Sequence, residues 1–372
     1  MDIKTIAISM TDSHLLNTGL GEFENSIAIR LARRAPELRS KYGIRLLFIV
    51  EKCQVGAYGP DVDYHVISPT KRALLKMWFM APLRRWLMPK IDLLHWTDQF
   101  FKFRIRLAPI QLMTIHDVNF MHNNISKSSI MRKSLRMRRR MAQMTHFSFI
   151  SKFTEQDVLH YFPTQLPERV IYNGVTNLNT ESADTYEQTL KDMNVPKDFL
   201  FHISRWSDKK NVLLQLEMMQ HLPNEHLVLA GSGKKKFEQS VKDTIERLSL
   251  HNVTVVGRIS TEQKAALLSR CKALIFPSLS EGFGLPVAEA MCFGKPSFIT
   301  RLTSLPEIGG DINYYFTSLE AKQMAKDVEQ GLADFATNPD SKAQALKQRA
   351  ATFSWDNSAD GYIQYYLDLL KK

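Results

Sequence analysis

Two carboxylates eight positions apart mark the segment SLSEGFGLPVAEA, which covers residues 278–290. Between Glu281 and Glu289 lie Gly282 and Gly284, which can adopt positive φ and let the backbone approach a ligand closely. Ionised carboxylates accept hydrogen bonds well from sugar hydroxyls, whereas they would repel a phosphate. We therefore expect the two acids to contact a hydroxyl-rich part of a ligand.

The same segment predicts a helix that begins near Leu285, directly after a strand over residues 273–277. Pro286 suits the first turn of a helix, because its missing N–H has no intrahelical partner there. The free N–H groups from Phe283 to Leu285, together with the positive end of the helix dipole, favour an anion such as phosphate. The segment thus indicates a sugar joined to a phosphate; the alternative is a core helix with incidental acids.

Two cations follow a second predicted strand, over residues 199–204. Arg205 and Lys210 are five residues apart at a strand-to-helix junction. Two cations fixed there could neutralise a diphosphate without a metal, although solvated surface charge is the alternative interpretation. Because Lys210 follows a strand end, we expect it to lie outside a hydrophobic core.

Other candidate residues also follow predicted strands. His116 and Asp117 come after the strand over residues 111–115, where a side chain can reach a ligand, although a lone histidine is more often structural. Three glycines lie in loops that allow close backbone approach: Gly19, Gly21 and Gly231. Asp61 and Asp63 form a D-x-D pattern, and the alternative that it offers is a metal-dependent transferase. Because Arg205 and Lys210 could neutralise a diphosphate without a metal, we expect no metal and no cofactor.

These residues can act together only in a fold that brings the ends of several strands close to one another. The sequence predicts such a fold. At 372 residues it is longer than one core usually supports, which favours two domains. Apolar runs alternate with helix-length segments, which is typical of α/β proteins with parallel sheets. The predicted strands cover residues 5–10, 44–50, 91–95, 111–115 and 146–150, then 199–204, 227–230, 253–256, 273–276 and 297–300. Two doubly wound domains facing a central cleft would bring both sets of strand ends to that cleft.

The segment between the two series of strands, residues 178–197, is polar and predicts a linker. We therefore expect one domain over residues 1–178 and a second over residues 179–354, with a closing helix over residues 355–372.

Charge is unevenly distributed along the chain. The net charge is +11, and residues 1–191 carry 27 Lys and Arg against 17 Asp and Glu. Two stretches account for most of the excess: residues 71–90, which interleave cations with Trp78, Phe79 and Trp86, and residues 132–140. Such stretches favour an anionic membrane surface or nucleic acid, and solvated helix faces are the alternative.

Cysteines and apolar runs limit the cellular context. Three scattered cysteines argue against disulfides and zinc, and we expect a reducing, cytoplasmic location. No run reaches the roughly 18 apolar residues of a spanning helix, and the first residues predict a strand rather than a signal peptide.

Taken together, these motifs resemble the retaining glycosyltransferases of family four, which have the GT-B fold of two facing Rossmann-like domains. Glu281 and Glu289 fit the family's E-x7-E motif. The other matches are Arg205, Lys210 and Asn211 in G-R-x4-K-N, with Ser204 where Gly is usual; His116-Asp117; Ser151 to Thr154; Asn173 to Val175; and the closing segment from Phe353. The resemblance covers nearly the whole chain. It implies that the first domain binds the acceptor, with the closing helix over residues 355–372 packed back on it, and that the second domain binds the donor.

The resemblance implies a role for each residue. Arg205 and Lys210 would hold the donor diphosphate, with help from the amides of Phe283, Gly284 and Leu285 and from the glycines Gly231 and Gly282. Glu289 would contact the ribose, Glu281 and His116 the transferred sugar, and the backbone of Arg258 and Ile259 the base. Gly19 and Gly21 would allow close approach to the phosphates or the acceptor.

The expected function is therefore a metal-independent hexosyltransferase of cell-surface polysaccharide synthesis. Residues 303–311 resemble a segment of bacterial mannosyltransferases, which implies mannose from GDP-mannose as the donor and a lipid-linked or saccharide acceptor. The basic first domain implies peripheral contact with the inner face of a membrane. The alternatives are a UDP-hexose donor and, from another class of protein, a non-catalytic module that binds nucleic acid.

Overall fold

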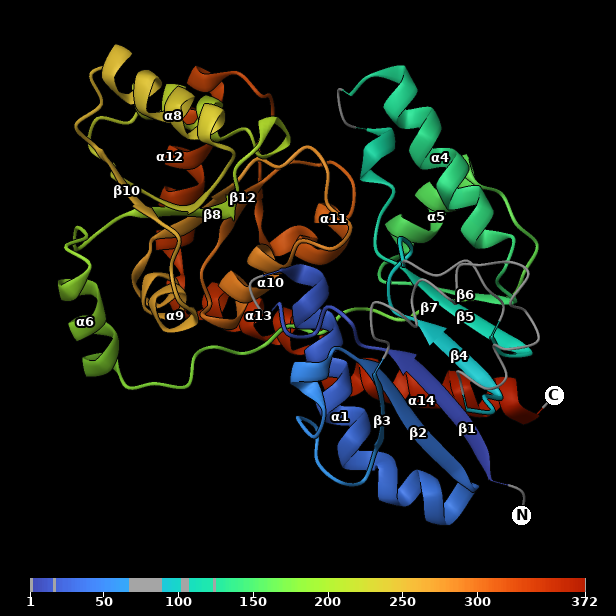
Figure 1. Ribbon diagram of the computed structural model, residues 1–372. Coiled ribbons are helices and arrows are strands. Elements are labelled where there is room, and N and C mark those ends of the chain that lie inside the picture. The colour runs from blue at the N-terminus through green and yellow to red at the C-terminus, as the bar shows by residue number, and fades with distance from the viewer. Residues whose placement is uncertain (1–2, 16–17, 67–88, 102–106, 123–124, 372) are drawn as a thin grey trace. The chain divides into compact units, whose positions relative to one another are not determined.

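The chain divides into two compact units. Unit 1 contains Met1–Gly174 and Ser354–Lys372, and unit 2 contains Val175–Phe353. The boundaries expected from the sequence were residues 178 and 354. The computed structural model describes residues 3–15, 18–66, 89–101, 107–122 and 125–371 (Figure 1). Most of the predicted basic and aromatic stretch over residues 71–90 lies outside the described residues.

The described part of unit 1 is built on a seven-stranded parallel sheet of order β3-β2-β1-β4-β5-β6-β7. Its strands are β1 (Lys4–Ser9), β2 (Ile44–Val50), β3 (Asp63–Val66), β4 (Leu93–Trp96), β5 (Ile110–Ile115), β6 (His146–Phe149) and β7 (Glu168–Val170). Because helices cover both faces of a parallel sheet, its central strands are continuous apolar runs, and this is why they were predictable from the sequence.

Helices pack on both faces of this sheet. They are α1 (Gly19–Tyr42), α4 (Lys127–Met141), α5 (Lys152–Tyr161) and α14 (Trp355–Lys371), with short 3-10 turns η1 (Lys52–Gln54) and η3 (Asn119–Met121). α1 and α14 share one core with the sheet, which includes Phe23, Leu31 and Tyr362. α4 and α5 share the other, which includes Met137 and Val158.

α14 is held to the sheet by buried polar contacts as well as by apolar packing. The hydroxyl of Tyr366 lies 2.6 Å from Nδ1 of His95, whose Nε2 lies 2.7 Å from the hydroxyl of Thr114. Burial lowers the pKa of His95 to about 3, so this imidazole is neutral. The terminal helix is therefore an integral part of unit 1, as Figure 1 shows. None of the helices in the described ranges is both long and apolar enough to cross a bilayer.

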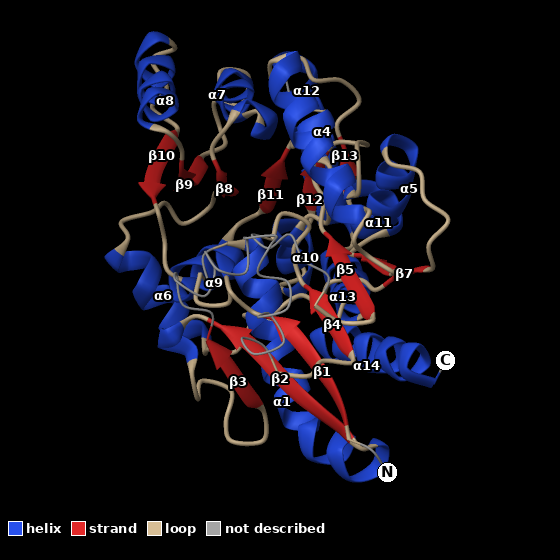
Figure 2. Ribbon diagram, turned by 45° about the vertical axis from the view of Figure 1, so that its right-hand side comes forward, coloured by secondary structure: helices blue, strands red, loops and turns tan. Residues whose placement is uncertain are grey.

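Unit 2 is built on a second parallel sheet, of order β10-β9-β8-β11-β12-β13 (Figure 2). Its strands are β8 (Leu200–Arg205), β9 (Leu227–Ser232), β10 (Val253–Gly257), β11 (Ala273–Phe276), β12 (Ser297–Ile299) and β13 (Tyr314–Tyr315). Its helices are α6 (Ala183–Asp192), η4 (Asp208–Lys210), α7 (Val212–Met219), α8 (Lys235–Arg247), α9 (Thr261–Arg270), α10 (Leu285–Cys292), α11 (Leu305–Gly309), η5 (Gly310–Ile312), α12 (Ala321–Thr337) and α13 (Pro339–Ala351).

The predicted α/β class with two doubly wound sheets is confirmed, and each predicted strand is present within a few residues. The prediction omitted β3, β7 and β13, which are short edge strands with little buried apolar surface. The prediction of a linker over residues 178–197 is wrong, because this segment contains α6. Tyr186 of α6 is buried in the core of unit 2 beside Phe293, but one buried residue in ten is too weak a periodic signal to predict a helix.

Candidate functional site

The predicted binding residues of unit 2 lie where four neighbouring parallel strands end. Arg205 is the last residue of β8, Gly231 and Ser232 end β9, Arg258 follows β10, and residues 277–284 follow β11. Since β10, β9, β8 and β11 are adjacent and parallel, their carboxyl ends lie at one edge of the sheet. The edge carries both cations and carboxylates.

Lys210 and Glu281 form an ion pair at this edge. The Nζ atom of Lys210 donates a hydrogen bond to Oε1 of Glu281, and the two side chains are only 11% and 14% exposed. The ammonium also lies 5.0 Å from the centre of the Phe276 ring. The expectation that Lys210 lies outside the core is therefore wrong, because its side chain runs over an apolar ring to reach Glu281.

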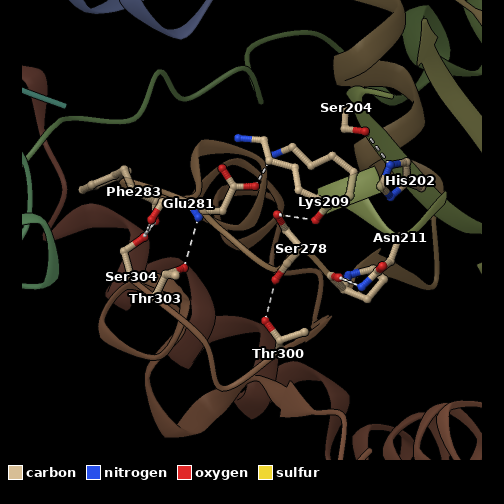
Figure 3. A network of polar contacts seen from close by, with 12 residues as sticks. His202, Ser204, Lys209, Asn211, Ser278, Glu281, Phe283, Thr300, Thr303 and Ser304 are labelled. Carbon is tan, nitrogen blue, oxygen red and sulfur yellow. Dashed lines mark hydrogen bonds and ion pairs between the residues drawn. The ribbon is translucent and has the colours of Figure 1, made fainter. Parts of the chain in front are cut away.

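The loops that carry this pair are joined by backbone contacts (Figure 3). Asn211 adopts the left-handed conformation, with φ 50°, and its Nδ2 donates to the carbonyl of Pro277 over 2.9 Å. The amide of Leu279 donates to the carbonyl of Lys209 over 2.8 Å. These contacts join the loops that follow β8 and β11, and those loops carry the two residues of the ion pair.

The backbone of Glu281 is held from the opposite side by the segment that precedes α11 (Figure 3). Its amide donates to the hydroxyl of Thr303 over 3.1 Å, and the hydroxyl of Ser304 lies 3.1 Å from the carbonyl of Glu281 and 2.9 Å from that of Phe283. Gly284, with φ 102°, then precedes α10, which begins at Leu285 as predicted. The mannosyltransferase-like segment over residues 303–311 thus supports the turn that carries Glu281.

Glu289 lies inside α10 and has a cationic partner that the sequence did not reveal. The Nζ atom of Lys264, on α9, lies 2.5 Å from Oε1 of Glu289, whose side chain is 4% exposed. A capping box at Ser260 and Gln263 marks the beginning of α9 in the sequence. No local pattern, however, indicates that this helix faces α10, so the pair was not predictable.

A neutral histidine supports the end of β8. Nδ1 of His202 lies 2.9 Å from the carbonyl of Ile275, which can only accept, so Nδ1 carries the proton. Nε2 consequently accepts from the hydroxyl of Ser204 over 2.8 Å (Figure 3). Burial, reinforced by the charge of Lys210, lowers the pKa of His202 to about 4. Ser204 stands where the resembling family usually has glycine. Its hydroxyl thus donates to His202 of the same strand.

At the end of β9, the group that approaches Gly231 closely is a carbonyl of the chain's own backbone. Gly231 has φ 111°, and a Cβ atom there would lie 1.8 Å from the carbonyl oxygen of Ser204. The neighbouring Ser232 hydroxyl accepts from Nε of Arg258 over 2.8 Å. Ile259 packs against the core of unit 2, whereas Arg205 is exposed. The predicted ligand contacts at these residues stay predictions.

Unit 1 carries the remaining predicted residues. Nε2 of His116 donates to the carbonyl of Thr97 over 2.7 Å, which leaves Nδ1 as an acceptor. The ring meets the edge of Phe23 at 4.8 Å between centroids. Burial lowers the pKa of His116, against the opposing effects of the Thr97 carbonyl and of the carboxylates Asp98 and Asp117. His116 is therefore suited to accept a hydrogen bond from a hydroxyl group.

The two glycines of the first loop have different environments. Gly19 begins α1, earlier than the predicted start near Glu22, and is exposed. A Cβ atom on Gly21 would lie 2.1 Å from the carbonyl oxygen of Leu15. The close approach that Gly21 allows is thus made by the preceding loop. Asp61 and Asp63 form the alternative metal site considered in the sequence. Oδ2 of Asp63 lies 3.3 Å from Nε of Arg45.

These features define the class of protein. Residues 188–352, most of unit 2, match the family of glycosyl transferases group 1, so this unit is a domain of that family. The resemblance to family-four glycosyltransferases is confirmed, and the chain has the GT-B fold. Over 239 residues the chain is 32% identical to the serotype-specific mannosyltransferase WbdA of Escherichia coli, which covers 60% of this chain and 28% of WbdA.

Two further proteins show how far the similarity extends. The GDP-mannose:cellobiosyl-diphosphopolyprenol alpha-mannosyltransferase of Xanthomonas oryzae pv. oryzae is 28% identical over 215 residues, which is 54% of this chain and 53% of that protein. The chain thus spans about half of one relative and under a third of the other. A glycosyltransferase from Rickettsia africae has a TM-score of 0.73 at 17% identity over the whole of both chains, which shows a shared fold.

Proposed function

We propose that the protein is a retaining glycosyltransferase that transfers mannose from GDP-mannose to a lipid-linked acceptor in the synthesis of a cell-surface polysaccharide such as O-antigen. The observation that carries this proposal is the Lys210–Glu281 pair at the end of β8 and β11, beside the amino end of α10. The names of the mannosyltransferase relatives support the choice of sugar and base.

The charges of the site suit a nucleotide diphosphate sugar. Arg205 supplies a positive charge for the diphosphate that is unpaired within the described part of the chain, Lys210 supplies ammonium hydrogen-bond donors, and the first amides of α10 supply further donors. Glu281 and Glu289, each already paired with a lysine, accept from hydroxyls of the sugar and ribose without imposing a net negative charge on the phosphates. The same groups would stabilise the nucleoside diphosphate as it leaves, with no metal required.

A panel of labelled donors tests the proposal. GDP-mannose should be hydrolysed slowly without an acceptor, and faster than UDP-glucose, UDP-galactose or UDP-N-acetylglucosamine. Mass spectrometry of a lipid extract incubated with GDP-mannose should then reveal a product heavier by one hexose. Preference for a UDP-sugar would replace the donor, and failure to bind or turn over any nucleotide sugar would overturn the proposal.

The proposed location is the inner face of the cytoplasmic membrane, and α4 is the described element that supports it. This helix contains no acidic residue, and it exposes Arg132, Arg136 and Arg139. Two apolar side chains, Met131 and Leu135, are 70% and 48% exposed between these cations. Exposed apolar groups within a basic face are typical of helices that lie in an anionic membrane interface.

Vesicle flotation tests this surface. Replacing Arg132 and Arg136 with Gln should weaken binding to phosphatidylglycerol vesicles roughly thirtyfold, since each cation contributes about 1 kcal/mol. Met131→Ser with Leu135→Ser should also weaken it, whereas replacing the exposed Lys322 and Lys326 of α12 with Gln should not. Binding to DNA that is stronger than binding to vesicles would instead favour the nucleic-acid module.

A further inference from the structure

Glu24, on α1, is a buried carboxyl group to which the proposed reaction assigns no role. It is 1% exposed. Its Oε2 accepts from the amide of Asp12, in the loop after β1, over 2.7 Å. Its Oε1 lies 2.5 Å from the hydroxyl oxygen of Thr97, directly after β4. One side chain therefore joins α1 to the loops that follow two neighbouring strands.

The hydrogen atoms around Thr97 can be assigned by counting. Its hydroxyl oxygen contacts the carbonyl oxygen of Ser9 as well as the carboxyl of Glu24. A threonine hydroxyl has one hydrogen to donate, and a carbonyl oxygen can only accept. If Thr97 donates to Ser9, the contact with Glu24 needs a hydrogen on the carboxyl group. The arrangement is satisfied by a neutral carboxylic acid.

The electrostatic environment agrees with this assignment. Burial raises the pKa of Glu24 to about 8, and the nearby Asp12 and Asp98 act in the same direction, against the opposing effects of the contact with the Thr97 hydroxyl and of the Asp12 amide. Burial also raises the pKa of Asp98 and of Tyr58, which faces Glu24 from the segment after η1. His116, whose Nε2 donates to the carbonyl of Thr97, has a lowered pKa and offers no compensating charge.

We propose that Glu24 is a protonated positioning residue, which holds the loop after β1 and, through Thr97, the imidazole of His116. Thr97 donates its side-chain proton to Ser9, while its main-chain carbonyl accepts from Nε2 of His116. Ionisation of Glu24 would place a carboxylate against a hydroxyl oxygen that has no hydrogen left to donate.

Glu24 also acts on the loop that covers Gly21. A Cβ atom on Gly21 would lie 2.9 Å from the carbonyl oxygen of Asp12, so this loop packs directly on α1. The amide of Asp12 holds the same residue to Glu24. The functional part of this inference, the placement of His116 and the loop, rests on the proposed transferase activity; the protonation state does not.

Stability measured against pH tests the protonation state. Between about pH 5 and about pH 8 the native state binds a proton that the unfolded state has released, so the wild type becomes less stable as pH rises. Its unfolding constant should increase up to tenfold per pH unit through this one group. Glu24→Gln, whose amide can donate to Thr97 and whose oxygen can accept from Asp12, should remove that dependence.

Glu37→Gln is the matched control, because Glu37 lies on the same helix with its side chain 63% exposed. This variant should keep the wild-type dependence on pH. An identical pH dependence in wild type and Glu24→Gln would overturn the proposal. Should Glu24→Gln fail to fold, a carbon-13 NMR titration of the wild type decides: a glutamate carboxyl titrating near pH 8 supports the inference, and its absence refutes it.

Activity gives the second readout. Transfer by the wild type should decline above about pH 8, Glu24→Gln should shift or remove this alkaline limb, and Glu24→Ala should lose activity at every pH. If no nucleotide sugar is turned over, the proposed function fails while the stability measurements still decide the protonation of Glu24. If transfer occurs but the alkaline limb is unchanged in Glu24→Gln, the positioning role alone fails.

Discussion

Lys210→Ala should reduce the proposed mannose transfer by about 10²–10³-fold, the loss typical of removing one charged group that stabilises a developing negative charge. The ammonium is 11% exposed and held against Glu281, so it is positioned before the donor binds and needs no reorganisation during the reaction. The measurement is single-turnover transfer at saturating GDP-mannose. A variant that retained most of its activity would contradict the assignment of Lys210 to the diphosphate.

The same change should also destabilise unit 2, which the sequence alone did not lead us to expect. Removing Lys210 leaves the Glu281 carboxylate 14% exposed without its cation, at a cost of about 3 kcal/mol. Lys210→Met combined with Glu281→Gln removes both charges and should restore stability but not transfer. Recovery of transfer in this double variant would assign the pair a purely structural role; Lys322→Ala, on the exposed face of α12, is the control for loss of one charge.

Gly231→Ala should lower the melting temperature of unit 2 strongly for the addition of a single methyl group. The new Cβ atom would lie 1.8 Å from the carbonyl oxygen of Ser204, and φ is 111°, which L side chains rarely adopt. Relief requires movement of β8 against β9, so we expect a cost of at least about 3 kcal/mol, or a shift of about 6–12 °C. Differential scanning calorimetry measures it directly.

Gly257→Ala separates the clash from the backbone strain. Gly257 ends β10 with φ 68°, and no atom lies within 4 Å of the position that its Cβ atom would occupy. This variant should lose stability only through the left-handed conformation of the new alanine. The expected cost is about 1 kcal/mol, or a decrease in melting temperature of about 2–4 °C. Equal shifts in the two variants would mean that the contact between Gly231 and Ser204 is not tight in solution.

Much of the candidate site could be predicted because its local elements have local causes. The boundaries of α10 follow from Gly284, Pro286 and Gly294, whose backbone preferences act over a few residues. The buried parallel strands are short apolar runs, so the ends of β8 and β11, and the residues after them, could be located without a structure.

Contacts between separate elements had no such signal. Lys210 and Glu281 are 71 residues apart, and Lys264 and Glu289 are 25 apart on different helices. Nothing in either segment specifies which charge faces which, because this depends on strand order and on the packing of helices over the sheet. The helix α6 was missed for a related reason: its one buried residue, Tyr186, packs beside Phe293 of another element, and a single buried residue leaves little periodic signal in the sequence.

By itself, the sequence determined the two doubly wound sheets, the turn before α10 and the types of residue at the strand ends, since these depend on propensities and periodicities within short segments. The tertiary structure decided that Lys210 and Lys264 are paired in advance with Glu281 and Glu289, and that Glu24 lies where a proton is needed. Burial and long-range proximity control ionisation and pairing, and both arise only when the chain is folded.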